Sequence, residues 1–147
     1  MFIFIVLLLV VILIFAFILV KFYRNKYVIF PAEYSWIAIG STKGFTASEE
    51  EVRQADNLFR DFLQNQKDIL KLENYRIKNL WMYKVQYVGF VNEKGERNIW
   101  ANYFCNTMDR DWKKEIVHID GGGNCFFQVE INLDTKTVYN FMVNRPY

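Results

Sequence analysis

The chain lacks the surplus of positive charge that nucleic-acid binding requires. Its 18 Lys and Arg stand against 16 Asp and Glu, which gives a formal net charge of +2 at pH 7. Because phosphates must be met by a basic excess, we expect no nucleic acid as a partner. Cysteine is equally scarce. Two cysteines can neither build a disulfide-dense scaffold nor fill a four-ligand zinc site, so we expect no metal and no cofactor.

Internal repeats and low-complexity tracts are absent as well. Disorder is excluded by the composition, since 18% of the residues are aromatic and 52% are hydrophobic. A length of 147 residues allows one domain with an appendage.

One long hydrophobic run stands out at the start of the chain. Residues 2–20 are all apolar and contain neither Gly nor Pro. As a helix they would span roughly 30 Å, the thickness of the hydrocarbon part of a bilayer. A core helix would keep one polar face, and a signal peptide would begin with positive charge and end at small residues. We therefore expect a transmembrane anchor over residues 1–21, with the lipid bilayer as a partner.

Cations and aromatic residues follow this run directly. We expect them at the membrane interface: Lys21, Phe22, Tyr23, Arg24 and Lys26. No Lys or Arg precedes the run. The positive-inside rule then predicts a single-pass protein of the cell membrane with its C-terminal part in the cytoplasm.

Residues 22–47 form a juxtamembrane connector in this interpretation, and residues 48–147 form the domain. Ser48 and Glu51 match the capping box that begins a helix. An apolar stripe at helical period follows: Val52, Ala55, Leu58, Phe59, Phe62 and Leu63. The solvent side of this helix would carry Arg53, Asp56, Arg60 and Asp61.

After Asn74 the hydrophobic period changes to two, which is typical of strands. The expected strands are residues 81–88, 99–105, 115–119, 125–133 and 138–144. Asn92–Glu96 reads as a hairpin loop. Asp120–Asn124, with three glycines, reads as a tight turn at positive φ.

This order of elements predicts an α+β fold, with one helix packed on a curved antiparallel sheet of four to five strands. The order resembles the cystatin-like and nuclear-transport-factor-like folds. The Gln-x-Val-x-Gly inhibitor loop of cystatins is not present in the sequence.

The C-terminal half also carries a set of short motifs. They are the Gly-containing hairpin Tyr87–Gly95, Trp112-Lys113-Lys114, Asp120-Gly121-Gly122, Asn124–Phe127, Asn132 with Thr135, and Val143-Asn144. Through these motifs residues 85–144 resemble a group of small bacterial proteins common among Bacteroidetes. That group usually continues Val-Asn-Gly, whereas this chain ends Asn144-Arg145-Pro146-Tyr147. The resemblance implies a fold and a bacterial source, and no reaction.

Catalytic residues are few. His118 is the only histidine, and a nucleophile–His–acid site would have to combine it with Cys105 or Cys125. His118 lies in an apolar run, which favours a structural histidine, and both cysteines fall on the core-facing register, which favours free buried thiols. A disulfide between Cys105 and Cys125 is the alternative if the domain is exported. His118 and Asp120 are the one acid–base pair that can be named, and we expect no enzyme and no catalytic residue.

The sheet face opposite the helix is the expected binding surface, because apolar anchors alternate there with polar groups. We expect a protein partner, or a second copy of the chain, to contact Trp100, Phe104, Phe126, Met142, Lys84 and Gln86. The alternative, weighted equally, is that residues 27–39 fold back and cover this face.

The expected function is a membrane-anchored binding or scaffold protein. One alternative is an accessory or immunity-type protein of the cell envelope with its domain outside the cytoplasm, which the oxidation state of the cysteines would distinguish. Another is a small-ligand binder or enzyme that uses the concavity of the sheet, which a closed pocket lined by His118, Asp120 and tyrosines would favour.

Overall fold

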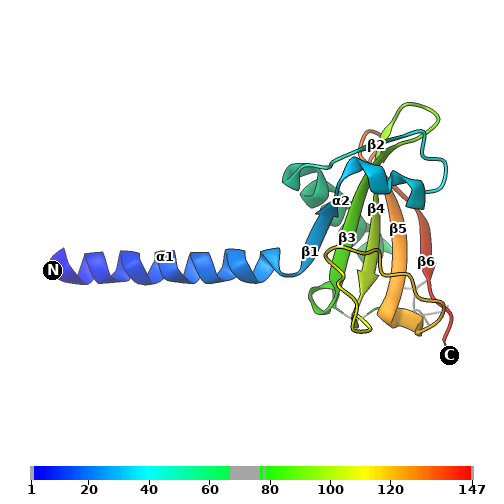
Figure 1. The fold of residues 1–147 in the computed structure, drawn as a ribbon. Helices are drawn as coiled ribbons and strands as arrows, with labels where there is room; N and C mark the ends of the chain where they lie inside the picture. The colour runs from blue at the N-terminus through cyan, green and yellow to red at the C-terminus, as the bar shows by residue number, and fades with distance from the viewer. Residues whose placement is uncertain (1, 67–76, 78, 147) are drawn as a thin grey trace.

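The structure is a computed structural model that describes residues 2–66, 77 and 79–146, and in the first helix only the side chains of residues 4–18. A helix leads into a six-stranded mixed sheet with a second helix packed on one face (Figure 1). The elements are α1 (Phe2–Arg24), β1 (Tyr27–Phe30), η1 (Ala32–Ile37), β2 (Lys43–Phe45), α2 (Glu49–Asn65), η2 (Leu80–Met82), β3 (Lys84–Val91), β4 (Arg97–Phe104), η3 (Gly123–Cys125), β5 (Phe126–Asn132) and β6 (Thr137–Val143).

Helix α1 extends away from the sheet, and its described side chains are exposed (Figure 1). Within the described residues, no helix is long and apolar enough to cross a membrane. This finding overturns the expected transmembrane anchor over residues 1–21. The predicted single-pass membrane location and cytoplasmic placement depended on this anchor, so they are overturned as well.

Strand β3 pairs with three other strands of the sheet. The sheet order is β1-β3-β4-β5-β6, and β2 also pairs with β3. Strand β1 runs parallel to the first half of β3, with Tyr27 opposite Val85, whereas β2 runs antiparallel to its second half, with Phe45 opposite Gly89. The expected sheet of four to five antiparallel strands is therefore wrong, because residues 22–47 are not a mere connector and supply two strands. The expected strand at 115–119 is an irregular segment.

Two glycines allow β2 to fit in this position. A Cβ atom on Gly89 would lie 2.5 Å from the carbonyl oxygen of Phe45, and one on Gly44 would overlap the carbonyl oxygen of Ala32. The backbone of β2 therefore approaches both β3 and η1 more closely than a side chain would permit.

Helix α2 covers the first face of the sheet. Its capping box is confirmed, since the Ser48 hydroxyl accepts from the Glu51 N–H at 3.2 Å and Glu51 accepts from the Ser48 N–H at 2.9 Å. The apolar stripe packs on the sheet, with Ala55 and Phe59 fully buried. The expected hairpins β3–β4 and β5–β6 are present. The expected register of β6 is wrong in its first half, because a bulge between Gln128 and Glu130 places Tyr139 opposite Glu130, and Val138 instead packs toward the helix.

Asp56 corrects the expected polar side of α2, because it is buried. One of its carboxylate oxygens accepts hydrogen bonds from the Tyr87 and Tyr103 hydroxyls at 2.8 and 2.9 Å. The other pairs with the Arg60 guanidinium at 3.0 Å. Burial raises the pKa of both tyrosines well above its ordinary value, so their hydroxyls stay protonated and donate. The carboxylate therefore ties α2 to the two central strands.

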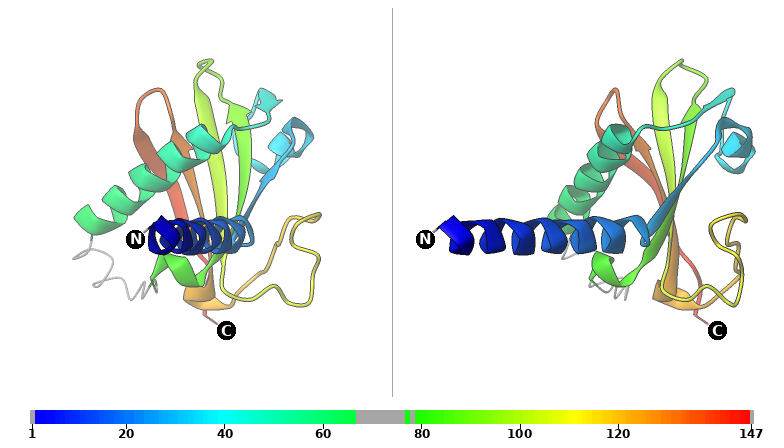
Figure 2. Two further views of the ribbon diagram at one scale, coloured as in Figure 1. Left: turned by 90° about the vertical axis from the view of Figure 1, so that its left-hand side faces the viewer. Right: turned by 60° about the vertical axis from the view of Figure 1, so that its left-hand side comes forward.

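The second face of the sheet is covered by two separate segments (Figure 2). Under η1 lie Phe30, Ala38, Val88, Phe90 and Trp100. Under the segment 105–125 lie Phe104, Trp112, Val117 and Phe126. The two coverings touch each other, because the Tyr34 hydroxyl donates to the Lys114 carbonyl at 3.1 Å.

Gln86 holds the second covering in place. This side chain is fully buried on β3. Its amide nitrogen donates to the carbonyls of Trp112 and Glu115, both at 2.6 Å. Its amide oxygen accepts from the Val117 N–H at 2.9 Å and from the Asn102 side chain at 3.0 Å. One side chain thus pairs three backbone groups of an irregular segment that has no ladder of its own.

A disulfide closes the base of the same segment. Cys105 follows β4 and Cys125 precedes β5, with their Cα atoms 5.0 Å apart and a sequence separation of 20. The expected free, buried thiols are therefore wrong. The reason is the register: Phe104 pairs with Phe126, so the two cysteines are the next facing pair along the ladder.

Replacing Gln86 with leucine should destabilise the domain by about 3 kcal/mol, because buried backbone groups lose their partners at about 1–3 kcal/mol each. Urea unfolding measures the change. The matched control is Gln128→Leu, half-buried on the same face, which should cost well under half as much. Equal losses in the two variants would contradict the role assigned to Gln86.

Reduction of the disulfide should lower the free energy of unfolding by about 3 kcal/mol, since the bridge closes a loop of this length in the unfolded chain. Urea midpoints with and without a reductant measure the effect. The Cys105→Ser, Cys125→Ser double variant should show no response to reductant, and a response there would attribute the loss to something else.

Candidate functional site

The aromatic face expected to bind a partner is interior. Trp100, Phe104 and Phe126 are at most 5% exposed, and Gln86 is fully buried. Lys84 is half-buried, and Met142 alone is well exposed, at 51%. The alternative of a covered face describes the structure, although residues 27–39 do only part of the covering and the segment 105–125 does the rest.

The expected membrane-interface residues are described only in part. The side chains of Lys21, Phe22, Tyr23 and Arg24 lie outside the described part of the structure. Lys26 is half-buried where α1 meets the sheet, and its carbonyl accepts from the Val85 N–H at 2.9 Å.

The His118–Asp120 pair stands on the surface. The His118 Nε2 and Asp120 Oδ1 atoms are 3.6 Å apart, and both side chains are largely exposed. A structural histidine in a strand was expected, and His118 instead lies in an irregular segment where water reaches it.

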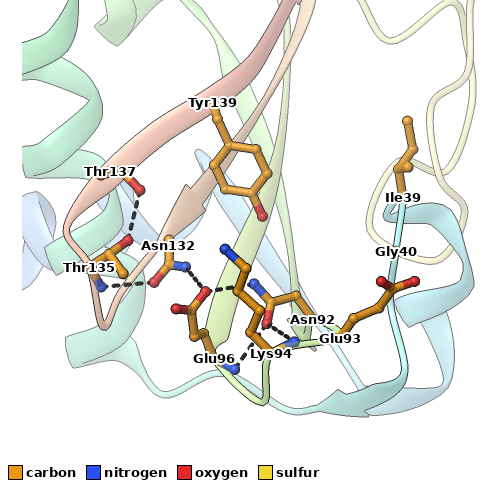
Figure 3. Close-up of a pocket in the computed structure, with 10 residues that line it drawn as sticks. All are labelled: Ile39, Gly40, Asn92, Glu93, Lys94, Glu96, Asn132, Thr135, Thr137 and Tyr139. Carbon is orange, nitrogen blue, oxygen red and sulfur yellow. Dashed lines mark hydrogen bonds between the residues drawn. The ribbon is translucent and has the colours of Figure 1, made fainter.

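The open part of the second face holds the candidate site. It is a pocket of about 440 Å³ between the end of η1 and the hairpin ends of the sheet (Figure 3). A volume of this size is ordinary for ligand pockets. The lining residues come from three stretches of chain: Ile39, Gly40, Asn92, Glu93, Lys94, Glu96, Asn132, Thr135, Thr137 and Tyr139.

The floor of the pocket is a network of amides around Glu96 (Figure 3). Its Oε2 atom accepts from the Asn92 and Asn132 side chains at 2.9 and 2.8 Å. These two hydrogen bonds lower the pKa of Glu96, which keeps it ionised at neutral pH. The side-chain oxygens of Asn92 and Asn132 accept hydrogen bonds from backbone N–H groups in the loops to which they belong. The two hairpin loops are therefore locked together through one carboxylate.

Tyr139 lines the pocket from β6, and the buried Glu130 is its partner residue on β5. The Tyr139 hydroxyl donates to Asn98 Oδ1 at 2.8 Å, and burial raises the pKa of this tyrosine. Glu130, facing Tyr139 across the strand pair, is 3% exposed and accepts from the Ile39 N–H and the Asn140 amide. Burial raises the pKa of Glu130. Its bond to Ile39 fixes the rim of the pocket to the sheet.

Sequence reasoning assigned these residues to turns and strands and missed their assembly. The one available signal was that Asn92–Glu96 and Asn132–Thr137 are both rich in polar side chains and end neighbouring hairpins. The third part, Ile39–Gly40, comes from the stretch interpreted as a connector.

A second groove runs along the outer side of α2 and holds no comparable chemistry. Its charges are balanced, with Glu50 paired to Arg53 and with Asp61 and Lys136 of opposite sign. Gln54 is engaged by the Leu133 carbonyl at 3.1 Å. In the part of the chain that the structure describes, no cluster of His, Cys, Asp and Glu could hold a metal ion.

Comparison with known proteins gives no family for this chain: no family model, no curated protein and no solved structure matches it. The function is therefore argued from the α+β scaffold and its pocket alone.

Glu130 should make the domain more stable as the pH falls from 7 toward 5. Its pKa is raised by folding, so as the pH falls toward the ordinary pKa of a glutamate the folded state takes up the proton before the unfolded state does. Glu130→Gln cannot titrate. The free energy of unfolding of the wild type, measured by urea titration at each pH, should rise relative to that of the variant as the pH is lowered. A difference that stays constant with pH would contradict the assigned burial of the charge.

Proposed function

We propose that the chain is a binding module without catalytic activity, and that its pocket receives a basic side chain of a protein partner. The observation that carries the proposal is the charge of the lining. Glu93 and Glu96 supply two carboxylates, whereas Lys94 is the one cation among the lining residues.

The carboxylates of the pocket offer hydrogen-bond acceptors to a ligand. Glu96 uses only its Oε2 atom within the described structure, so Oε1 keeps its lone pairs for a ligand. A ligand rich in N–H donors complements such a surface, and a guanidinium or ammonium group adds opposite charge.

Apolar side chains at the rim support a protein rather than a free amine as the ligand. Ile39 lines the pocket and is 70% exposed. Trp36, in the η1 segment just before it, is equally exposed. Exposed aromatic and aliphatic anchors beside a polar site are typical of protein interfaces.

The arrangement favours binding over catalysis. Glu96 is held by two amides, and the hydroxyls of Thr135 and Thr137 bond each other at 2.8 Å. Among the described lining residues, no acid or base therefore lies beside a nucleophile that it could activate.

The Cys105–Cys125 disulfide supports a domain that works in an oxidising compartment, because such bonds persist there and are rare where thiols are kept reduced. This agrees with the envelope alternative raised by the sequence, in which the partner is another extracytoplasmic protein.

The test is a titration of the full chain with the peptide acetyl-Gly-Arg-Gly-amide, followed by NMR shifts of the backbone amides. We expect saturable shifts at residues 92–96 and 132–139, with a Kd near the millimolar range of one charge-assisted contact. That range corresponds to about 4 kcal/mol of binding free energy. The same peptide with citrulline in place of arginine should shift these amides far less, because the charge is lost at nearly equal shape.

Variants decide whether the pocket is responsible. Glu93→Gln with Glu96→Gln should weaken binding about tenfold or more. Glu115→Gln, an exposed glutamate in the segment 105–125, should leave it unchanged. Equal shifts with the citrulline peptide, or equal binding by all variants, would refute the proposal.

A further inference from the structure

Strand β6 is an edge of the sheet and lies beside the acidic pocket. It pairs with β5 on one side, and no described strand pairs with its other side (Figure 1). Natural edge strands are usually kept from pairing with other chains by charged residues, by proline or by a bulge. The seven residues Thr137–Val143 contain no charge and no proline, so the bulge beside Asn140 is the one safeguard present in β6.

The ladder between β4 and β5 shows which backbone groups of β6 face outward. The Leu133 N–H donates to the Arg97 carbonyl at 2.9 Å, so the hydrogen-bonded pair two residues further on is Ile99 with Ile131. Ile131 therefore directs its backbone groups toward β4. Val138 faces Ile131 from the other side, so its own N–H and C=O point away from β5, toward the edge.

The bulge confines a further strand to the first half of β6. Asn140 and Phe141 together face the single residue Val129 of β5, and Asn140 adopts a φ of 47°. Because a bulge bends its strand, a partner strand aligned with residues 137–139 separates from β6 at this point. A partner residue opposite Val138 would exchange two backbone hydrogen bonds with it.

The residues next to that partner residue would lie on the pocket side of the sheet. Val138 packs toward the helix face, whereas Thr137 and Tyr139 line the pocket on the opposite face. An added strand keeps the same alternation, so its side chains beside Thr137 and Tyr139 also project over the pocket face.

The Tyr139 ring leads from this edge toward the carboxylates. Its hydroxyl donates to Asn98 of β4, two strands away, so the ring lies across β5, among the lining residues (Figure 3). An arginine that starts beside Tyr139 can extend along the ring toward Glu96. The planar guanidinium stacks on aromatic faces and pairs with carboxylates, which suits this path better than an ammonium group does.

We propose that the partner adds an extended segment antiparallel to residues 137–139 of β6, with an arginine next to the residue that faces Val138. The inference rests on the proposed function, because the carboxylates Glu93 and Glu96 select the segment by its charge. In such strand addition the main-chain hydrogen bonds supply affinity and the side-chain pocket supplies specificity. The partner is therefore recognised through an extended, arginine-containing stretch of its chain.

Three methylated forms of acetyl-Gly-Arg-Gly-amide test the main-chain bonds on the full chain. Each carries one N-methyl group, on the first glycine, on the arginine or on the last glycine. One of the two glycine-methylated peptides should bind about fivefold more weakly, because it loses one hydrogen bond to Val138. The arginine-methylated peptide should bind like the parent, because its N–H points away from β6.

Amide hydrogen exchange and a pair of proline variants test the protein side. A saturating amount of the parent peptide should slow exchange of the Val138 N–H about fivefold or more and leave that of Val143 unchanged. Val143 is the matched control: the next N–H, of Asn144, donates to the Phe126 carbonyl, so the Val143 N–H also points outward, beyond the bulge. Val138→Pro should weaken binding about fivefold, whereas Val143→Pro should bind like the wild type.

The outcomes separate this inference from the proposed function. If the parent peptide binds at Glu93 and Glu96 while all methylated peptides bind alike and Val138 exchange is unchanged, strand addition is refuted and the pocket remains. If no arginine peptide binds, both proposals are wrong. Protection of Val138 without peptide, increasing with protein concentration, would assign the edge to a second copy and overturn the inference. The methylated peptides decide on the wild-type chain if Val138→Pro loses its native circular dichroism.

Discussion

The side-chain amide of Gln86 is the interaction on which the second face of the sheet depends. It uses both hydrogens and both lone pairs inside the protein, toward Trp112, Glu115, Val117 and Asn102. An irregular segment cannot lie on a sheet unless its backbone groups find partners. This one residue supplies three of them, and the segment then buries the aromatic side chains beneath it.

The two faces of the sheet are thus covered by different kinds of structure. On the first face a regular helix satisfies its own backbone, and the buried carboxylate of Asp56 fixes it to two tyrosines. On the second face two irregular coverings share the work and leave the last hairpin partly open. The pocket lies in this opening, where Glu130 and Glu96 connect the rim and the hairpin loops to the sheet.

Local rules predicted the local elements well. The capping box at Ser48, the stripe that follows it, and the hairpin at Asn92–Glu96 depend on residues close in sequence, and each is present. Asp56 was predicted on the solvent side of α2 because helical periodicity sorts residues by hydrophobicity alone. Periodicity contains no information about two buried tyrosines on the sheet that need a hydrogen-bond acceptor. The strand Tyr27–Phe30 was missed for a similar reason, since a four-residue parallel strand is stabilised only by its partner, here β3.

The sequence by itself determined the α2 helix and the four antiparallel strands β3 to β6, because capping, period and turn residues act within a few positions. The bulge that sets the register of β6 was decided by the tertiary structure. Tertiary structure alone decided which aromatic side chains are covered, whether the cysteines pair, and where the carboxylates of the pocket meet. Those outcomes depend on contacts between segments tens of residues apart, and their energy comes from burial and from hydrogen bonds that exist only once the sheet has formed.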